Sequence, residues 1–97
     1  MTKKKPNPKE EFDWIAEKLR PLAVPVETLH TDPKNARTHD ADNLTAIEAS
    51  LKRFGQVSPI VANSRNNDVV IGNGRYTVAR DRLGWTHLAV IWKELTD

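Results

Sequence analysis

The sequence predicts an α+β fold in which two or three helices pack on a small mixed sheet of about four short strands. Residues 40–54 carry apolar side chains at helical spacing, whereas residues 59–62 and 87–92 are β-branched or alternate at strand spacing. At residues 69–83 a β-branched run enters a glycine turn, and the turn opens a helix. A chain of 97 residues has room for one domain with a thin core.

Composition excludes several classes of protein. The chain contains no cysteine, which rules out a disulfide framework, a thiolate metal site and a thiol nucleophile. No stretch approaches the roughly 20 apolar residues of a membrane span. The basic residues 3–5 are followed by Pro6 and charged residues, not by the apolar segment of a signal peptide. We therefore expect a cytoplasmic protein without a membrane partner.

The net charge of +2 gives little support for nucleic-acid binding. Lys3, Lys4 and Lys5 account for the excess, and without them twelve basic residues face thirteen acidic ones. The high isoelectric point therefore reflects the start of the chain more than a basic surface. We expect residues 1–9, which are polar and carry two prolines, to form a flexible basic tail.

Residues 10–22 are expected to form an N-terminal helix that precedes the main domain at 23–97. Acidic residues begin and basic residues end the stretch 10–20, as the helix dipole favours, and Pro21 would stop the helix. The apolar stripe of this helix would consist of Phe12, Ile15 and Leu19. We expect the stripe to pack on the core, and contact with a partner protein is the alternative.

The next segment predicts a strand followed by a long polar loop. Residues 24–29 alternate and are β-branched, and Pro25 places the strand at an edge of the sheet. Residues 30–39 form a polar stretch that is long for a compact domain, and such loops often carry function. His30 and His39 lack the close ligand spacing of a metal site, so we predict no metal site.

The helix predicted for residues 40–54 has a buried stripe at helical spacing, which consists of Leu44, Ile47, Leu51 and Phe54. Gly55 would stop this helix. A strand at 59–62, a turn at 63–67 and a returning, buried strand at 69–71 then form a β-hairpin.

A glycine turn at 72–74 leads into a helix at 75–83, which Gly84 ends before a last strand at 87–92. The first N–H groups of such a helix point at the turn without partners, and the helix dipole favours a negative charge there. Arg75 would lie where its guanidinium could bind phosphate or carboxylate oxygens as a fork. The alternative is a tight turn in which Arg75 makes a structural salt bridge.

Three segments in this order resemble the N-terminal domain of the ParB/sulfiredoxin superfamily: DPKNAR at 32–37, SLKRFGQVSPI at 50–60 and IGNGRYTVA at 71–79. The resemblance covers residues 23–93 and implies a ParB/sulfiredoxin-like fold. Members include partition proteins that bind CTP, sulfiredoxins and free serine kinases that use adenine nucleotides, and stand-alone phage modules. Partition proteins carry further DNA-binding and dimerisation domains, and we expect neither in 97 residues.

The resemblance implies a site for the phosphates of CTP or ATP, with Mg²⁺, at the glycine turn and the start of its helix. The family's turn has the form Gly-x-x-Arg, which Gly72 and Arg75 match. In the family, an arginine of the first segment and the backbone of the second line the nucleotide pocket. The residues implied to bind nucleotide or phosphate are Gly72, Asn73, Gly74, Arg75, Tyr76, Arg37, Asn35, Gly55, Gln56 and Ser58.

The sequence also departs from the family in ways that limit its chemistry. Sulfiredoxins need a cysteine in the glycine turn, and its absence excludes their activity. Partition proteins carry Glu-Arg where this chain has Asn73 and Gly74, so an acidic residue that could organise Mg²⁺ or water is missing. An amide is a poor general base. We therefore assign no catalytic residue and expect a weak nucleotide hydrolase at most.

These observations rank three functions. The first is a ParB-like nucleotide-binding module in a DNA-related process of phage or plasmid type, with DNA or a DNA-processing protein as partner. The alternative is a regulatory or protein-interaction module that has lost nucleotide chemistry, and its thin core would gain from a homodimer. The second alternative is a DNA-binding or nuclease domain, which needs clustered cations or paired carboxylates that the sequence does not supply.

Overall fold

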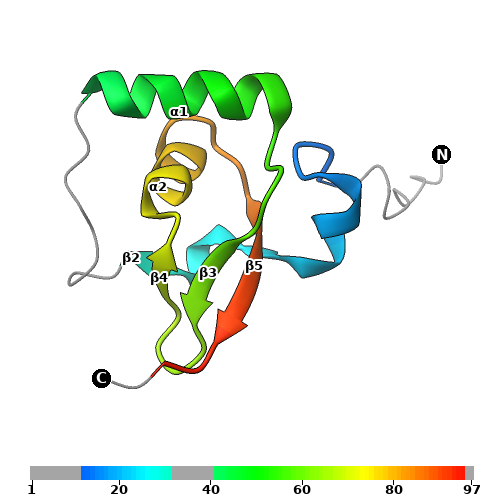
Figure 1. The fold of residues 1–97 in the computed structure, drawn as a ribbon, viewed down its shortest axis with the longest axis vertical. Helices are drawn as coiled ribbons and strands as arrows, with labels where there is room; N and C mark the ends of the chain where they lie inside the picture. The colour runs from blue at the N-terminus through cyan, green and yellow to red at the C-terminus, as the bar shows by residue number, and fades with distance from the viewer. Residues whose placement is uncertain (1–11, 32–40, 96–97) are drawn as a thin grey trace, which may run out of the picture.

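The computed structural model describes residues 12–31 and 41–95 (Figure 1). The elements in chain order are η1 (Glu17–Leu22), β1 (Ala23–Pro25), η2 (Val26–Thr28), β2 (His30–Thr31), α1 (Ala41–Phe54), β3 (Ile60–Asn63), β4 (Asp68–Ile71), α2 (Asn73–Asp81) and β5 (His87–Lys93), where η denotes a 3₁₀-helix. This α+β arrangement confirms the predicted class, although the sheet has five strands where about four were expected. Within the described ranges, no helix has the length and apolarity that crossing a membrane requires.

One mixed sheet contains all the strands, in the order β1-β5-β3-β4-β2. β5 is antiparallel to β1 and parallel to β3, with Ile60 opposite Val90. β3 and β4 form the predicted hairpin, and its register shifts between Val61 and Ala62. Ile71, expected in a buried strand, is 59% exposed because it pairs with Val61 on the side of the sheet away from the core cluster. β2, formed by two residues expected in a loop, adds a parallel edge beside β4.

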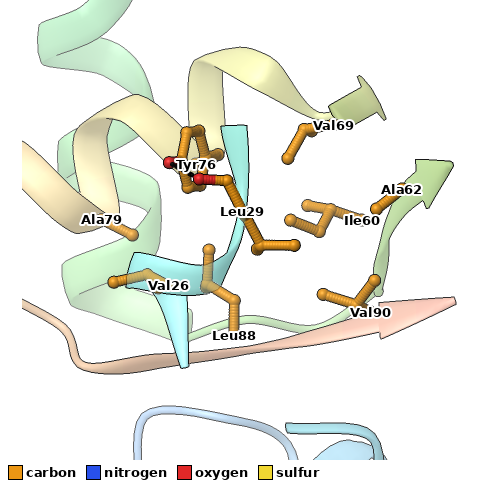
Figure 2. Packing of buried hydrophobic residues seen from close by; sticks show 9 residues of the cluster. All are labelled: Val26, Leu29, Ile60, Ala62, Val69, Tyr76, Ala79, Leu88 and Val90. Atoms are coloured by element: carbon orange, nitrogen blue, oxygen red, sulfur yellow. Dashed lines mark hydrogen bonds between the residues drawn. The ribbon is translucent and has the colours of Figure 1, made fainter. Parts of the chain in front are cut away.

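The core lies between the sheet and α2 (Figure 2). It consists of Val26, Leu29, Ile60, Ala62, Val69, Tyr76, Ala79, Leu88 and Val90. Tyr76 and Ala79 come from the helical face predicted at 75–83. The helix α1 packs against α2 (Figure 1). Burying one large apolar side chain contributes about 1.5–3 kcal/mol, so this cluster is the main source of stability.

The helix predicted for residues 10–20 is not formed over its described part. Only η1 is helical there, and it contains Pro21, the residue expected to end the helix. Ile15 instead makes an isolated parallel bridge with Gln56, and the Ala16 N–H donates to the Gln56 carbonyl at 2.9 Å. These long-range pairs outweigh the local preference, because a helix of about eleven residues is marginal alone. Ile15 is fully buried, as expected for core packing.

Two further predictions, the strand at 24–29 and the burial of Phe54, are wrong near the end of an element. The strand predicted at 24–29 stops at Pro25, where the Thr28 hydroxyl donates to the Pro25 carbonyl at 2.7 Å and closes η2. Phe54, predicted in the buried stripe of α1, is 61% exposed, whereas Leu51 is buried. Phe54 is the last residue of α1, and its ring lies 5.1 Å from the Arg53 guanidinium instead of in the core.

The Gln56 side chain forms hydrogen bonds with the backbone of β5, as a neighbouring strand would. Its amide accepts a hydrogen bond from the Ala89 N–H at 2.7 Å and donates one to the Ala89 carbonyl at 2.9 Å. Gln56 is 1% exposed and Ala89 is fully buried, so water does not reach these groups. The side chain therefore satisfies two backbone groups that β3, which begins only at Ile60, does not reach.

Replacing Gln56 by methionine, which keeps the length of the side chain, is expected to lower the free energy of unfolding by about 2–6 kcal/mol. The reason is that two buried polar groups of Ala89 lose their partners, at roughly 1–3 kcal/mol each. Urea denaturation measures the change. Lys93→Met, at an exposed position on β5, is the matched control and should cost less than about 0.5 kcal/mol. Equal stability of the two variants would contradict this role.

Candidate anion-binding site at the glycine turn

The glycine turn predicted at 72–74 joins β4 to α2. Gly72 caps the helix in the left-handed conformation, with φ 98° and ψ 24°. A Cβ at this position would lie 2.5 Å from Cγ2 of Ile60, so both the backbone conformation and the available space require glycine. α2 begins at Asn73, two residues before the predicted start. The start of the helix is therefore held directly against β3.

The first amides of α2 lie beside this turn. The Tyr76 N–H donates to the Gly72 carbonyl at 2.9 Å, so the amides of residues 73–75 precede the helical hydrogen-bond ladder. Among the described residues, no side chain caps this end of the helix. Asn73 and Gly74 are buried, whereas Gly72 and Arg75 are half-buried. The more accessible part of the turn thus consists of Gly72 and Arg75.

Arg75 reaches from α2 to the segment before β3. Its Nη1 donates to the Ser58 carbonyl at 2.8 Å and to the Ser58 Oγ at 3.0 Å, and its Nη2 donates to the Pro59 carbonyl at 3.4 Å. Every one of these acceptors is neutral, and none of the ion pairs between described residues involves Arg75. Burial lowers the pKa of Arg75, because it removes water from the cation. The structural salt bridge considered as the alternative is not formed within the described residues.

Tyr76, another predicted site residue, is engaged inside the protein. Its side chain is 1% exposed, and its hydroxyl donates to the Leu29 carbonyl at 2.8 Å (Figure 2). The same hydroxyl accepts a hydrogen bond from Arg80 Nη1 at 2.9 Å. Arg80 also pairs with Asp81 at 2.7 Å, which raises the pKa of Arg80. The hydroxyl is therefore already used in holding α2 to the start of β2.

Gly55 and Gln56 are also engaged within the fold. A Cβ at Gly55 would overlap the Trp14 carbonyl, and the Gln56 N–H donates to that carbonyl at 2.7 Å. The Gln56 side chain is fully occupied by the β5 backbone. The accessible part of this segment is its next two residues, Val57, which is 64% exposed, and Ser58.

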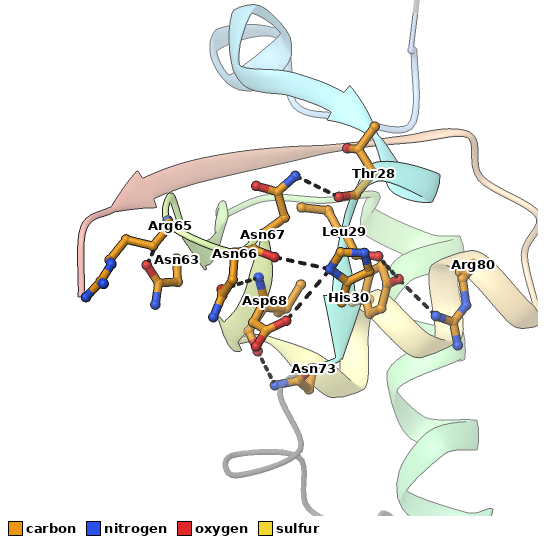
Figure 3. Close-up of polar contacts among 12 residues, drawn as sticks. Thr28, Leu29, His30, Asn63, Arg65, Asn66, Asn67, Asp68, Asn73 and Arg80 are labelled. Atoms are coloured by element: carbon orange, nitrogen blue, oxygen red, sulfur yellow. Dashed lines mark hydrogen bonds and ion pairs between the residues drawn. The ribbon is translucent and has the colours of Figure 1, made fainter. Parts of the chain in front are cut away.

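Asn73 is fixed by one end of its side chain (Figure 3). Its Nδ2 donates to the Val69 carbonyl at 2.8 Å, while its Oδ1 is buried and has no partner among the described residues. The side chain therefore carries an unused acceptor and no charge. Such a group can accept a hydrogen bond but cannot take a proton from water at neutral pH.

Asn35 and Arg37 lie outside the described residues, so their place in the site stays a prediction. His30 lies in β2, where its Nδ1 is 3.2 Å from the Asn66 carbonyl and 3.8 Å from the Asp68 carboxylate (Figure 3). Across residues 12–31 and 41–95, no group of three or more histidine and carboxylate side chains gathers as metal ligands would.

Two other cations are neutralised by a single carboxylate on α1. Lys52 and Arg82 pair with Glu48 at 3.1 and 3.2 Å, and both contacts lower the pKa of Glu48. Arg65 lies on the turn between β3 and β4, at the opposite end of β4 from the glycine turn. These side chains therefore do not extend the positive charge of Arg75 into one basic face.

Sequence reasoning missed two features that shape the site. One is Ile60, whose side chain allows only glycine at position 72. The other is the pair of carbonyls, of Ser58 and Pro59, that hold Arg75. Every residue has a carbonyl, so this contact leaves no signal in the sequence. The hairpin register is the one signal from which the approach of Ile60 to the glycine turn could have been found.

The fold and the glycine turn agree with a comparison against known protein families. Residues 10–97 match the family described as the ParB N-terminal domain. The chain therefore belongs to the ParB N-terminal domain family, which confirms the resemblance carried by the three sequence segments.

Individual relatives are consistent with this membership. The chain is 29% identical over 65 residues to the ParB-like nuclease domain-containing protein YnaK of Escherichia coli strain K12, an alignment that covers 67% of this chain and 74% of that protein. It is similar in structure, with a TM-score of 0.69 and 25% identity, to C-terminally truncated chromosome-partitioning protein ParB from Caulobacter crescentus complexed with CTP-γ-S; the match covers 77% of this chain and 44% of that one.

Two further solved structures show the same fold. The Caulobacter crescentus ParB complexed to the centromeric parS site has a TM-score of 0.61 and 23% identity, and the match covers 77% of this chain and 40% of that one. The Pnob8-like ParB-N domain has a TM-score of 0.63 and 21% identity, and the match covers 76% of this chain and 29% of that one. The chain thus spans less than half the length of the solved relatives it matches.

Proposed function

We propose that this domain binds the triphosphate of CTP or ATP, together with Mg²⁺, at the start of α2. The observation that carries the proposal is Arg75, a half-buried cation whose partners among the described residues are all neutral. A charge that is partly removed from water without a counter-ion is costly, so an anion beside it is favoured. The uncapped amides and the dipole of α2 favour an anion at the same place.

The donors that remain on Arg75 suit a phosphate group. A guanidinium carries five N–H groups, and the contacts with Ser58 and Pro59 use three of them. The other two are the Nε–H and one Nη2–H. Together with the amides of residues 73–75, they would surround phosphate oxygens, while the backbone of Val57 and Ser58 would face the base. Asn35 and Arg37 would complete the site as the family resemblance implies.

The chemistry of Asn73 favours binding over turnover. Its Nδ2 donates to the Val69 carbonyl, and its Oδ1, which has no partner within residues 12–31 and 41–95, is an uncharged acceptor. It would not serve as the base that activates water for attack on a phosphate. We therefore propose that the domain holds its nucleotide with slow hydrolysis at most.

The relatives support a role in a DNA-related process. The Caulobacter crescentus protein is complexed with CTP-γ-S in one structure and with parS DNA in another. We propose that this domain works in the cytoplasm as the nucleotide-responsive part of a partition-like or related process on phage or plasmid DNA. The ion pairs made by Lys52 and Arg82 do not favour direct binding of duplex DNA by the described surface.

Calorimetric titration of the 97-residue chain with CTP, ATP and GTP, each with Mg²⁺, tests the proposal. We expect saturable binding of CTP or ATP at one nucleotide per chain. Inorganic triphosphate should compete, because the phosphates make the strongest contacts. The nucleoside alone should not bind measurably. Absence of heat with all three nucleotides, or equal binding of the nucleoside, would contradict a phosphate site.

A further inference from the structure

A separate hollow lies where the start of β5 meets the end of β1. It encloses about 380 Å³ and is lined by Pro25, Val26, Glu27, Trp85, Thr86 and His87. None of these residues belongs to the predicted nucleotide site, and Arg75 contacts a different segment, at Ser58 and Pro59. The hollow is therefore a second candidate site with side chains of its own.

Contacts within the fold hold the walls of this hollow in place. Pro25 pairs with His87 between β1 and β5, and the Val26 N–H donates to the Thr86 carbonyl at 2.9 Å. The backbone N–H of Trp85 is bonded to α2 at 2.9 Å, and its side chain packs against the core cluster. The hollow is therefore formed before a ligand enters, which lowers the entropic cost of binding.

The lining of the hollow is mostly apolar and carries a single charge. Pro25 and Trp85 are both half-buried and contribute apolar surface. With histidine counted as neutral, Glu27 is the one charged residue among the six that line it. Glu27 is exposed, and none of the ion pairs between described residues involves it. The hollow thus places a carboxylate that lacks a described counter-ion beside apolar walls.

We infer that this hollow binds an arginine side chain of a partner protein. The methylene stem of the arginine lies along Pro25 and the Trp85 indole, and its guanidinium pairs with the Glu27 carboxylate. An arginine suits both parts, because its long stem covers apolar surface and its planar cation binds a carboxylate as a fork. The indole adds to the attraction, since a guanidinium is favoured beside an aromatic ring. The domain would then be a protein-interaction module as well, and the inference does not depend on the nucleotide proposal.

The single negative charge of the hollow disfavours other occupants. Nucleic acids and acidic peptides are themselves negative, so Glu27 repels them and no cation of the lining attracts them. Free arginine carries an additional carboxylate and an ammonium group, which would lose hydration beside apolar walls. Within a peptide both of these groups are neutral amides. The lining therefore favours an arginine that belongs to a polypeptide.

The test uses the full chain, isotope-labelled, and a short peptide of glycine and serine around a central arginine, followed by the NMR signals of the tryptophan indole N–H groups. Trp85 lines the hollow, whereas Trp92 lies near the opposite end of β5 and serves as an internal reference. We expect a saturable shift of the Trp85 signal and no shift of the Trp92 signal. The same peptide with citrulline or glutamate for arginine, free arginine, and an oligothymidine should each bind at least about tenfold more weakly.

Variants of two exposed glutamates assign this binding to the hollow. Glu27→Gln keeps the shape of the side chain but removes its charge, so it should weaken binding of the arginine peptide about tenfold. Glu94→Gln, directly after β5, is the matched control and should bind like the unchanged protein. Both positions are exposed, so the fold should be kept, and circular dichroism checks this. No saturable shift of the Trp85 signal, equal binding of any comparison probe, or unchanged affinity of Glu27→Gln would overturn the inference.

Discussion

Replacing Arg75 by alanine is expected to weaken nucleotide binding at least about a hundredfold while leaving the domain folded. The variant loses a cation and two donors aimed at phosphate, and hydrogen bonds to charged groups contribute roughly 1.5–3 kcal/mol each. The Ser58 and Pro59 carbonyls lose their donor as well, but Ser58 is exposed and water can take its place. The free energy of unfolding should therefore fall by only about 1 kcal/mol. Calorimetric titration and urea denaturation of the same variant separate the two effects.

Two companion variants sharpen this experiment. Arg75→Lys keeps the charge but loses the planar fork, so we expect an affinity between those of the unchanged protein and of Arg75→Ala. Arg65→Ala removes the same charge from the turn between β3 and β4, which is remote from α2, and should leave nucleotide binding unchanged. If Arg75→Ala binds nucleotide as tightly as Arg65→Ala, the phosphates do not lie at the start of α2.

Replacing Gly72 by alanine is expected to lower the free energy of unfolding by about 3 kcal/mol. A left-handed backbone costs roughly 1–2 kcal/mol for a residue with a Cβ. That Cβ would also lie 2.5 Å from Ile60 Cγ2 in the core, and overpacking of this kind costs typically 1–3 kcal/mol. The midpoint of urea denaturation measures the loss.

Gly84 provides the matched control for this prediction. It also has a positive φ, of 65°, but a Cβ there would meet nothing within 4 Å. Gly84→Ala should therefore show only the backbone part of the cost, about 1–2 kcal/mol. Similar losses at the two positions would mean that the approach of Ile60 does not constrain the turn.

Local signals in the sequence were sufficient for the central part of the fold. Gly55 ends α1, and the β-branched run before Gly72 forms β4, because turn residues and periodicity act through near neighbours. The N-terminal segment was mispredicted because the bridge between Ile15 and Gln56 joins residues far apart in the chain. No local pattern reports a pairing of that kind.

The position of the candidate site could be predicted from the sequence, but the contacts of its residues could not. The turn and the place of Arg75 beside it followed from glycine spacing and from the family resemblance. What Arg75 touches did not follow, since its acceptors are mainly backbone carbonyls of Ser58 and Pro59. The engagement of Tyr76 with Leu29 was likewise invisible, because an aromatic residue on a buried helical face predicts packing but not the partner of its hydroxyl.

The position of β5 also determines when the chain can assemble. This strand is the last one of the sheet to be synthesised, yet it lies between β1 and β3 and is the neighbour of both. Among the described strands, a nascent chain that lacks residues 87–93 therefore has none to pair with β1, and the Gln56 side chain lacks both backbone partners on Ala89. Since such distant pairings form late and slowly, the domain should reach its native state only after synthesis passes its final strand.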